Sequence, residues 1–136
     1  MACLDTTILI DAAGRGGRRL RVRAREKLAS LVDAGEVLTT TRFTVAELWV
    51  GVERAEDRQA EMEAVERMLR PLIVLDFDEV SARVFGSVTA RLQARGAPRG
   101  DMDVLIAAVA LVHGERIVTR NTRHFEAIPG LAVESY

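Results

Sequence analysis

The stretch GDMDVLIAAVALVHG, residues 100–114, decides how this chain folds. Every residue from Val104 to Val112 is apolar. A helix that is apolar all round has no face suited to water, so this helix is expected to be buried on all sides. Yet two carboxylates, Asp101 and Asp103, stand within one turn of its apolar body. The function of the chain depends on what these charged groups do at the start of a core helix.

The composition indicates one ordinary domain over residues 1–136. The chain is 49% hydrophobic, which is enough for a real core. Its formal net charge of −1 gives no indication of a nucleic-acid or membrane partner. Cys3 is the only cysteine, so an intrachain disulfide is impossible and zinc ligands are scarce. No apolar run reaches the ~20 residues of a membrane span, and we expect a cytoplasmic protein.

Short apolar segments alternate with helical patterns along the chain. Helices are predicted over residues 18–34, 44–54, 56–70, 78–95 and 101–113. Strands are predicted over residues 2–4, 36–40, 72–75 and 116–119, with a short fifth over 131–133. This alternation predicts the α/β class: a central parallel sheet of four to five strands with helices on both faces. The strand at 72–75 is all apolar, so we expect it to be buried on both faces, and residues 11–17 are expected to form a glycine-rich loop.

Five polar residues are expected to meet at one end of this sheet. Asp5 follows the first strand, Glu47 the second and Asn121 the fourth, while Asp101 and Asp103 begin the buried helix. Ligands of open parallel sheets bind beyond the carboxyl ends of the strands. Clustered carboxylates repel one another, and a divalent cation such as Mg²⁺ removes that penalty. Such a site can activate water against a phosphodiester.

Each of these residues also has a purely structural interpretation. Asp5 and Asp101 fit helix N-caps, and Asp103 fits a first-turn acid favoured by the helix dipole. Glu47 fits the return partner of a capping box that starts at Thr44. Asn121 fits a turn residue. The functional interpretation therefore depends on the convergence of all five positions.

Basic residues concentrate in one segment. Residues 14–27 carry six arginines and a lysine against one glutamate. Arginine suits bidentate contacts to phosphate, although such a run also suits a solvated helix face. The candidates for contact with a phosphate backbone are Arg15, Arg18, Arg19, Arg21 and Arg25.

Four motifs resemble one known family. LDTTILID (residues 4–11), TVAELWVG (44–51), GDMDVLIAA (100–108) and IVTRNTRHFEAIPGL (117–131) resemble the PIN-domain ribonucleases. More narrowly, they resemble the VapC-like toxins of prokaryotic toxin–antitoxin pairs. The resemblance covers nearly the whole chain, and the combination of motifs is more specific than any one of them.

This resemblance implies a compact α/β/α fold and metal-dependent endonucleolytic cleavage of RNA, with Mg²⁺ or Mn²⁺ as the ion. The acids of the family fall on Asp5, Glu47 and Asp103. Asp101 is then an accessory acid or a cap. The fourth acidic position of the family falls on Asn121, which cannot ionise. Asn121 stays a catalytic candidate, because its carbonyl oxygen can hold a metal-bound water, but tight binding of a second metal ion is not expected.

The resemblance also implies hydroxyl groups that orient the acids, and it implies binding partners. Thr6 and Thr119 are candidates for hydroxyls that orient the acids. The implied partners are an RNA substrate, a VapB-like antitoxin that inhibits the toxin, and a second copy of the chain in a homodimer. Two alternatives stay open: a housekeeping RNA-processing nuclease, and a module that binds RNA or a partner without cutting. A phosphatase with Asp5 as nucleophile is disfavoured because position 7 is threonine, where such enzymes have a second aspartate.

Overall fold

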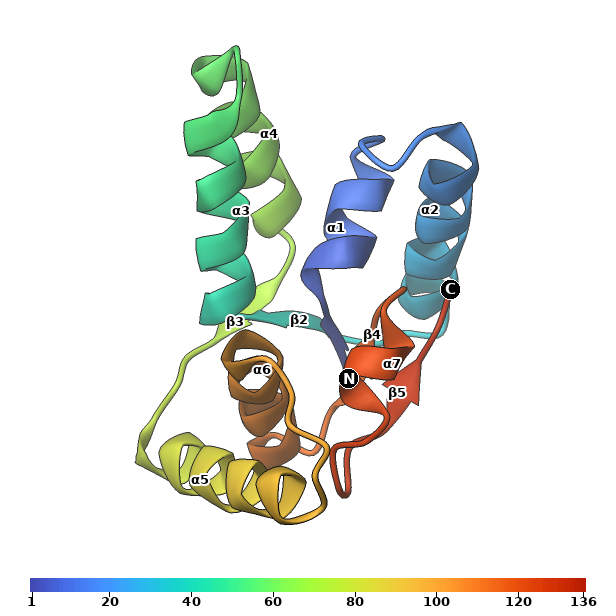
Figure 1. The fold of residues 1–136 in the computed structure, drawn as a ribbon. Coiled ribbons are helices and arrows are strands. Elements are labelled where there is room, and N and C mark those ends of the chain that lie inside the picture. Colours follow the sequence, from blue (N-terminus) through green and yellow to red (C-terminus); the bar gives the residue numbers. More distant parts are fainter.

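The protein was described from a computed structural model that covers all 136 residues. Its centre is a parallel sheet in the order β3-β2-β1-β4-β5 (Figure 1). The strands are β1 (Ala2–Leu4), β2 (Leu38–Thr41), β3 (Ile73–Leu75), β4 (Arg116–Val118) and β5 (Val133–Glu134). The predicted α/β class and the parallel arrangement are confirmed.

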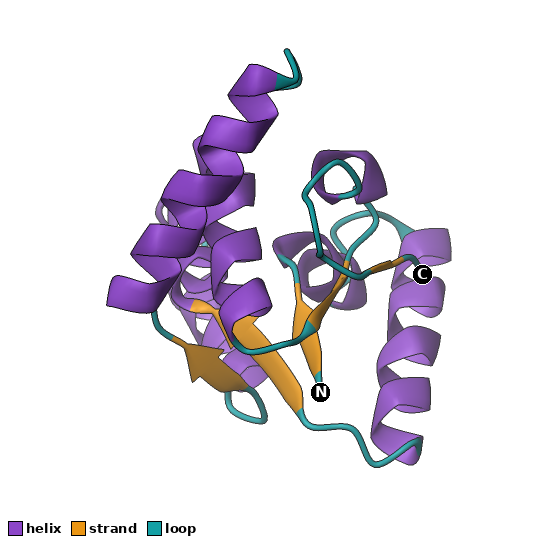
Figure 2. Ribbon diagram, turned by 90° about the horizontal axis from the view of Figure 1, so that it is seen from below, coloured by secondary structure: helices purple, strands orange, loops and turns teal.

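Seven helices flank this sheet, and they lie on both of its sides (Figure 2). They are α1 (Thr6–Ala12), α2 (Arg18–Asp33), α3 (Arg42–Arg54), α4 (Arg58–Leu69), α5 (Glu79–Ala94), α6 (Asp101–Val112) and the short α7 (Thr122–Phe125). None of these helices is long and apolar enough to cross a membrane.

The alternation of side chains along β1 divides the core in two. Ala2 and Leu4 belong to a cluster with residues of α1, α2, α3 and α4. Cys3, which lies between them and points to the other face, belongs to a cluster with residues of α5, α6 and α7. A strand buried on both faces in this way fits the continuous apolar run of residues 2–4.

Most of the apolar run of α6 is buried, but Leu105, Leu111 and Val112 are half-buried, so the prediction of burial on all sides is only partly right. Val104 and residues 106–110 are almost inaccessible to solvent. Three of these residues are alanines, which allow a neighbouring helix to approach closely, and α5 packs along α6. The start of α6 is therefore held rigidly at one end of the sheet.

The strand order creates a crevice beside β1. The chain order runs outward from β1 through β2 and β3 on one side, and through β4 and β5 on the other. Such a switch point leaves a crevice beyond the carboxyl ends of the two central strands. There the backbone N–H of Asp5 donates to the carbonyl of Val118 at 3.1 Å, so the segments that follow β1 and β4 run side by side.

Two local predictions about helix starts are wrong. α3 begins at Arg42, and the hydroxyl of Thr41 accepts the capping hydrogen bond from the N–H of Thr44 at 3.1 Å. Thr44 is therefore inside the helix, and Glu47 is not the return partner of a capping box. Asp101 is the first residue of α6, with Gly100 in the capping position.

Two further expectations also differ from the structure. β3 pairs only with β2 and is an edge strand, so Ile73 is 55% exposed although its strand is apolar. Asp11 does not begin a loop, because α1 continues to Ala12 and the Asp11 side chain is completely buried.

The close packing of α6 generates a stability prediction. Replacement of the fully buried Ala107 by Leu forces extra methyl groups into a filled core and is expected to lower the free energy of unfolding by about 1–3 kcal/mol. The control is Ala90→Leu on the exposed side of α5, expected to change it by less than about 0.5 kcal/mol. Urea unfolding followed by circular dichroism measures both, and equal effects would contradict this description of the core.

Candidate active site

Asp5 is held at the carboxyl end of β1 by two hydroxyls. It occupies the N-cap position of α1, yet its side chain makes no capping hydrogen bond. Its Oδ2 instead accepts hydrogen bonds from Thr119 at 2.7 Å and from Thr7 at 3.1 Å. The carboxylate is 6% exposed. The structure therefore gives Asp5 a fixed orientation that capping does not explain.

Glu47 lies in the second turn of α3 and faces α1. Its Oε2 accepts a hydrogen bond from the hydroxyl of Thr6. Burial raises the pKa of Glu47, the Thr6 hydroxyl opposes that shift, and the charges of Asp5 and Asp103 raise the pKa further. The Glu47 carboxylate is thus close enough to Asp5 and Asp103 for their negative charges to affect its pKa.

Asp103 lies in the first turn of α6. Its Oδ2 is 3.0 Å from Nδ1 of His124, which belongs to α7. Burial raises the pKa of Asp103, His124 opposes the shift, and the charge of Asp5 raises the pKa again. Asp5, Glu47 and Asp103 therefore form one group of mutually repelling carboxylates, which come from the residue before α1, from α3 and from α6.

The two remaining polar candidates stand apart from this group. Asp101 is exposed and borders a small cavity of about 40 Å³ together with Arg99 and with Thr89 of α5. Asn121 is exposed, and its backbone N–H donates to the hydroxyl of Thr119 at 3.0 Å. Asn121 is thus one hydrogen bond removed from Asp5, whereas Asp101 faces α5.

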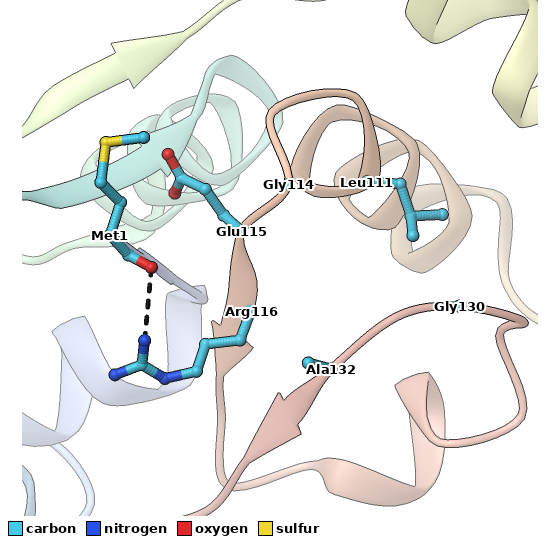
Figure 3. A pocket seen from close by; sticks show the side chains of 7 residues that line it. All are labelled: Met1, Leu111, Gly114, Glu115, Arg116, Gly130 and Ala132. Atoms are coloured by element: carbon cyan, nitrogen blue, oxygen red, sulfur yellow. Dashed lines mark hydrogen bonds between the residues drawn. The ribbon is translucent and has the colours of Figure 1, made fainter.

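The charge of the acidic group is not balanced within the chain. Neither Asp5 nor Glu47 forms an ion pair, and Asp103 pairs only with His124. The opposite end of the sheet differs, because there Arg116 pairs with both Glu36 and Glu134. Figure 3 shows a hollow of about 360 Å³ at that end, lined by Met1, Leu111, Gly114, Glu115, Arg116, Gly130 and Ala132. None of the candidate acids lines it.

The donor chemistry of the acidic group fits a hard divalent cation. All three side chains offer carboxylate oxygens, the ligands that Mg²⁺ prefers. As the side chains stand, no three His, Cys, Asp or Glu groups converge closely enough to hold a metal ion. Glu47 is engaged by Thr6, and Asp103 by His124. A cation bound by all three acids therefore requires the Glu47 and Asp103 side chains to move closer to Asp5.

The candidate arginines lie along α2 and the loop before it. Arg15 pairs with Glu61 of α4, and Nε of Arg25 donates to the carbonyl of Ala12 at 3.0 Å. None of the five forms a hydrogen bond or ion pair with the acidic group. One hollow of about 450 Å³ is lined by Gly14, Arg18, Arg21, Val22 and Arg25. These arginines make a basic surface on the helix that packs against α1.

Two contacts of the acidic group were not predicted from the sequence. Thr7 follows the predicted Thr6 and donates to the same oxygen of Asp5 as Thr119 does. His124 lies in the RHF segment of a motif that the resemblance already singled out, which was the available signal. Its position beside Asp103 depends on the packing of α7 against α6, and spacing alone does not show this.

Comparison with known proteins identifies similar chains. Residues 2–131 match the family described as PIN domain. The chain is 33% identical over 133 residues to Ribonuclease VapC2 of Haemophilus influenzae, covering 98% of this chain and 96% of that one. It is 36% identical over 93 residues to the tRNA(fMet)-specific endonuclease VapC of Shigella flexneri, covering 68% and 70%. The DNA-bound VapBC structure from Salmonella typhimurium has a TM-score of 0.83 and 30% identity, covering 98% and 96%.

The raised pKa of Glu47 predicts how stability depends on pH. The folded chain holds the Glu47 proton more tightly than the unfolded chain, whose glutamate pKa is about 4.3. The protonated Glu47 therefore contributes fully to the free energy of unfolding at a pH below its unfolded pKa. This contribution is lost as the pH rises through the pKa of Glu47 in the folded chain. Glu47→Gln, which cannot ionise, is therefore expected to be more stable than the wild type at pH 7.

Urea unfolding in EDTA between pH 4 and pH 7 measures this difference. The matched control is Glu66→Gln, on the exposed surface of α4, where no ion pair or buried acid is involved. The difference in free energy of unfolding between Glu47→Gln and the wild type should grow as the pH rises. The corresponding difference for Glu66→Gln should not change with pH. A gain that shrinks as the pH rises would contradict the assignment of Glu47 to the acidic group.

Proposed function

The chain belongs to the PIN-domain family, and on that premise we propose that it is an endoribonuclease that acts as the toxin of a toxin–antitoxin pair. The observation that carries the proposal is the group of three carboxylates at the switch point of the sheet, of which only Asp103 has an ion-pair partner, His124. The names of the relatives support it: one is a ribonuclease, another an endonuclease specific for a transfer RNA. The reaction is hydrolysis of a phosphodiester bond in RNA.

The residues proposed to hold a divalent cation are Asp5, Glu47 and Asp103. Mg²⁺ is the ion proposed, with Mn²⁺ as a substitute, because the donors are all carboxylate oxygens. When bound, the ion supplies positive charge for the phosphate and lowers the pKa of water. A second ion is not proposed, since Asn121 stands at the fourth position.

The rest of the site prepares these acids. Thr7 and Thr119 both donate to Oδ2 of Asp5, which leaves Oδ1 directed to a ligand. Thr6 donates to Oε2 of Glu47. The other oxygen of Glu47, Oε1, can therefore accept a hydrogen bond from the attacking water and orient that water. We assign the same preparatory role to His124, which fixes the Asp103 carboxylate until a ligand draws it away.

The partners follow from the same proposal. The antitoxin is a VapB-like protein, supported by the VapBC composition of the Salmonella typhimurium structure. Its basic side chains would meet the unbalanced charge of the acids and so inhibit the toxin. The arginines of α2 and its preceding loop, Arg15 to Arg25, contact the RNA backbone, with Arg15 first leaving Glu61. A homodimer completes the proposed assembly.

The proposal is tested by RNA cleavage with purified, partner-free protein. A pool of small RNAs that includes initiator transfer RNA is incubated with Mg²⁺, with Mn²⁺ or with EDTA. Cleavage is expected only with metal, and Asp103→Asn is expected to lower its rate at least about a hundredfold, the size of losing an essential charged group at a reacting centre.

The matched control is Asp101→Asn, two residues away in the same helical turn but facing α5. It should keep the rate within a few-fold of wild type. Binding of RNA without metal-dependent cleavage would favour the non-catalytic alternative. Equal rates in Asp103→Asn and wild type would mean that another protein or another residue is responsible.

A further inference from the structure

A second buried carboxylate lies six residues after Asp5, near the other end of α1, and it has a partner of opposite charge. Asp11 of α1 is completely buried. Its Oδ2 accepts a hydrogen bond from the Tyr136 hydroxyl at 2.8 Å and lies 3.4 Å from Nη1 of Arg120. Its Oδ1 has no hydrogen-bond partner. The loop after α1 closes tightly over it, since a Cβ at Gly16 would lie 2.2 Å from Oδ1.

Arg120 is attached to α1 at both of its ends. Its backbone N–H donates to the hydroxyl of Thr7 at 3.0 Å, and its guanidinium pairs with Asp11. Thr7 and Asp11 are four residues apart on a helix, so their side chains are neighbours on one face, about 5–6 Å apart. Thr7 also donates to Asp5. Arg120 is thus anchored on α1, the helix that directly follows the candidate metal ligand Asp5.

The ion pair keeps the guanidinium beside Asp11 and leaves most of its N–H groups unpaired. A buried carboxylate that lost its charge partner would be strongly destabilised, so Asp11 holds Arg120 firmly. Burial, together with the Asp11 carboxylate, raises the pKa of the Tyr136 hydroxyl, which therefore stays a protonated donor to Asp11. The Arg120 side chain is still 38% exposed, and a guanidinium has five N–H donors. Several of them remain available to a ligand.

We propose that Arg120 binds a phosphate of the RNA that flanks the scissile one, and that Asp11 is the residue that positions it. The inference rests on the proposed nuclease function. The guanidinium pairs with Asp11, four residues beyond Thr7 on α1, and contacts none of the three acids, so the phosphate assigned to it is a neighbour of the reacting one. An arginine fork held in one orientation suits bidentate recognition of phosphate oxygens.

Arg120→Ala tests the phosphate contact, with Arg123→Ala as the control. Arg123 is an exposed arginine three residues later, and it has no ion pair. Cleavage at subsaturating RNA is expected to fall about ten- to a hundredfold in Arg120→Ala, as for loss of one charged hydrogen-bonding group. The log–log salt slope of RNA binding in EDTA should shrink by about 0.7, one phosphate contact on a single strand. Arg123→Ala should match wild type in both, and equal behaviour of the two variants would overturn the proposal.

Asp11→Asn tests the positioning role, because it keeps the shape but removes the charge. If Asp11 acts through Arg120, this variant lowers cleavage at least about fivefold, and the double variant Asp11→Asn/Arg120→Ala is no slower than Arg120→Ala alone. A purely structural Asp11 would lower the melting temperature while leaving cleavage by the folded protein unchanged, or its effect would multiply with that of Arg120→Ala. Either result would overturn the assignment of Asp11.

Gly16→Ala gives the same information if Asp11→Asn does not fold. The added methyl group pushes on Oδ1 of Asp11 without altering any charge. Gly16→Ala is expected to lower the cleavage rate several-fold in the wild-type chain and to have no further effect in the Arg120→Ala variant. An unchanged cleavage rate in Gly16→Ala would contradict the positioning role of Asp11. If wild-type protein neither binds nor cleaves RNA, the proposed function itself fails, and the inference falls with it.

Discussion

The mutual repulsion of Asp5, Glu47 and Asp103 is the constraint on which the organisation of this protein depends. The parallel sheet brings the ends of its strands to one edge, and the switch between β1 and β4 opens a crevice there. Burial and neighbouring charge both disfavour the ionised forms of Glu47 and Asp103. A fold that needed only stability would have little use for this arrangement, whereas a cation site needs it.

The apolar helix α6 makes this arrangement possible. Because Val104 and residues 106–110 are buried in the core, α6 is anchored just beyond its first turn, and Asp103 contacts His124 of α7. The hydroxyls of Thr6, Thr7 and Thr119 orient two of the acids without adding positive charge. The two carboxylates at the start of a core helix therefore differ in kind: Asp103 contacts His124 and lies near the charge of Asp5, whereas Asp101 faces α5.

The sequence predicted the parallel sheet, because apolar strands alternate with helices along it. The pattern of polar residues after strands predicted a group of five, of which the structure brings together Asp5, Glu47 and Asp103, and the preference for Asp103 over Asp101 came from the family resemblance. The sequence did not predict features that depend on competition between neighbours. Thr41 and Thr44 can both cap a helix, and only the packing of α3 decides for Thr41. The apolar β3 gave no sign of its edge position, and Asp11 resembled a loop residue because its partners, Arg120 and Tyr136, are more than a hundred residues away.

The most direct test of the central claim is to locate the ion. Crystals of the partner-free protein grown with Mn²⁺ and measured near the manganese absorption edge would show its position by anomalous scattering. The account predicts one strong peak within bonding distance of Asp5 and Asp103, with Glu47 turned towards it directly or through a water molecule. A peak bound by Asp101, or no peak among the three carboxylates at a Mn²⁺ concentration that supports cleavage, would contradict it.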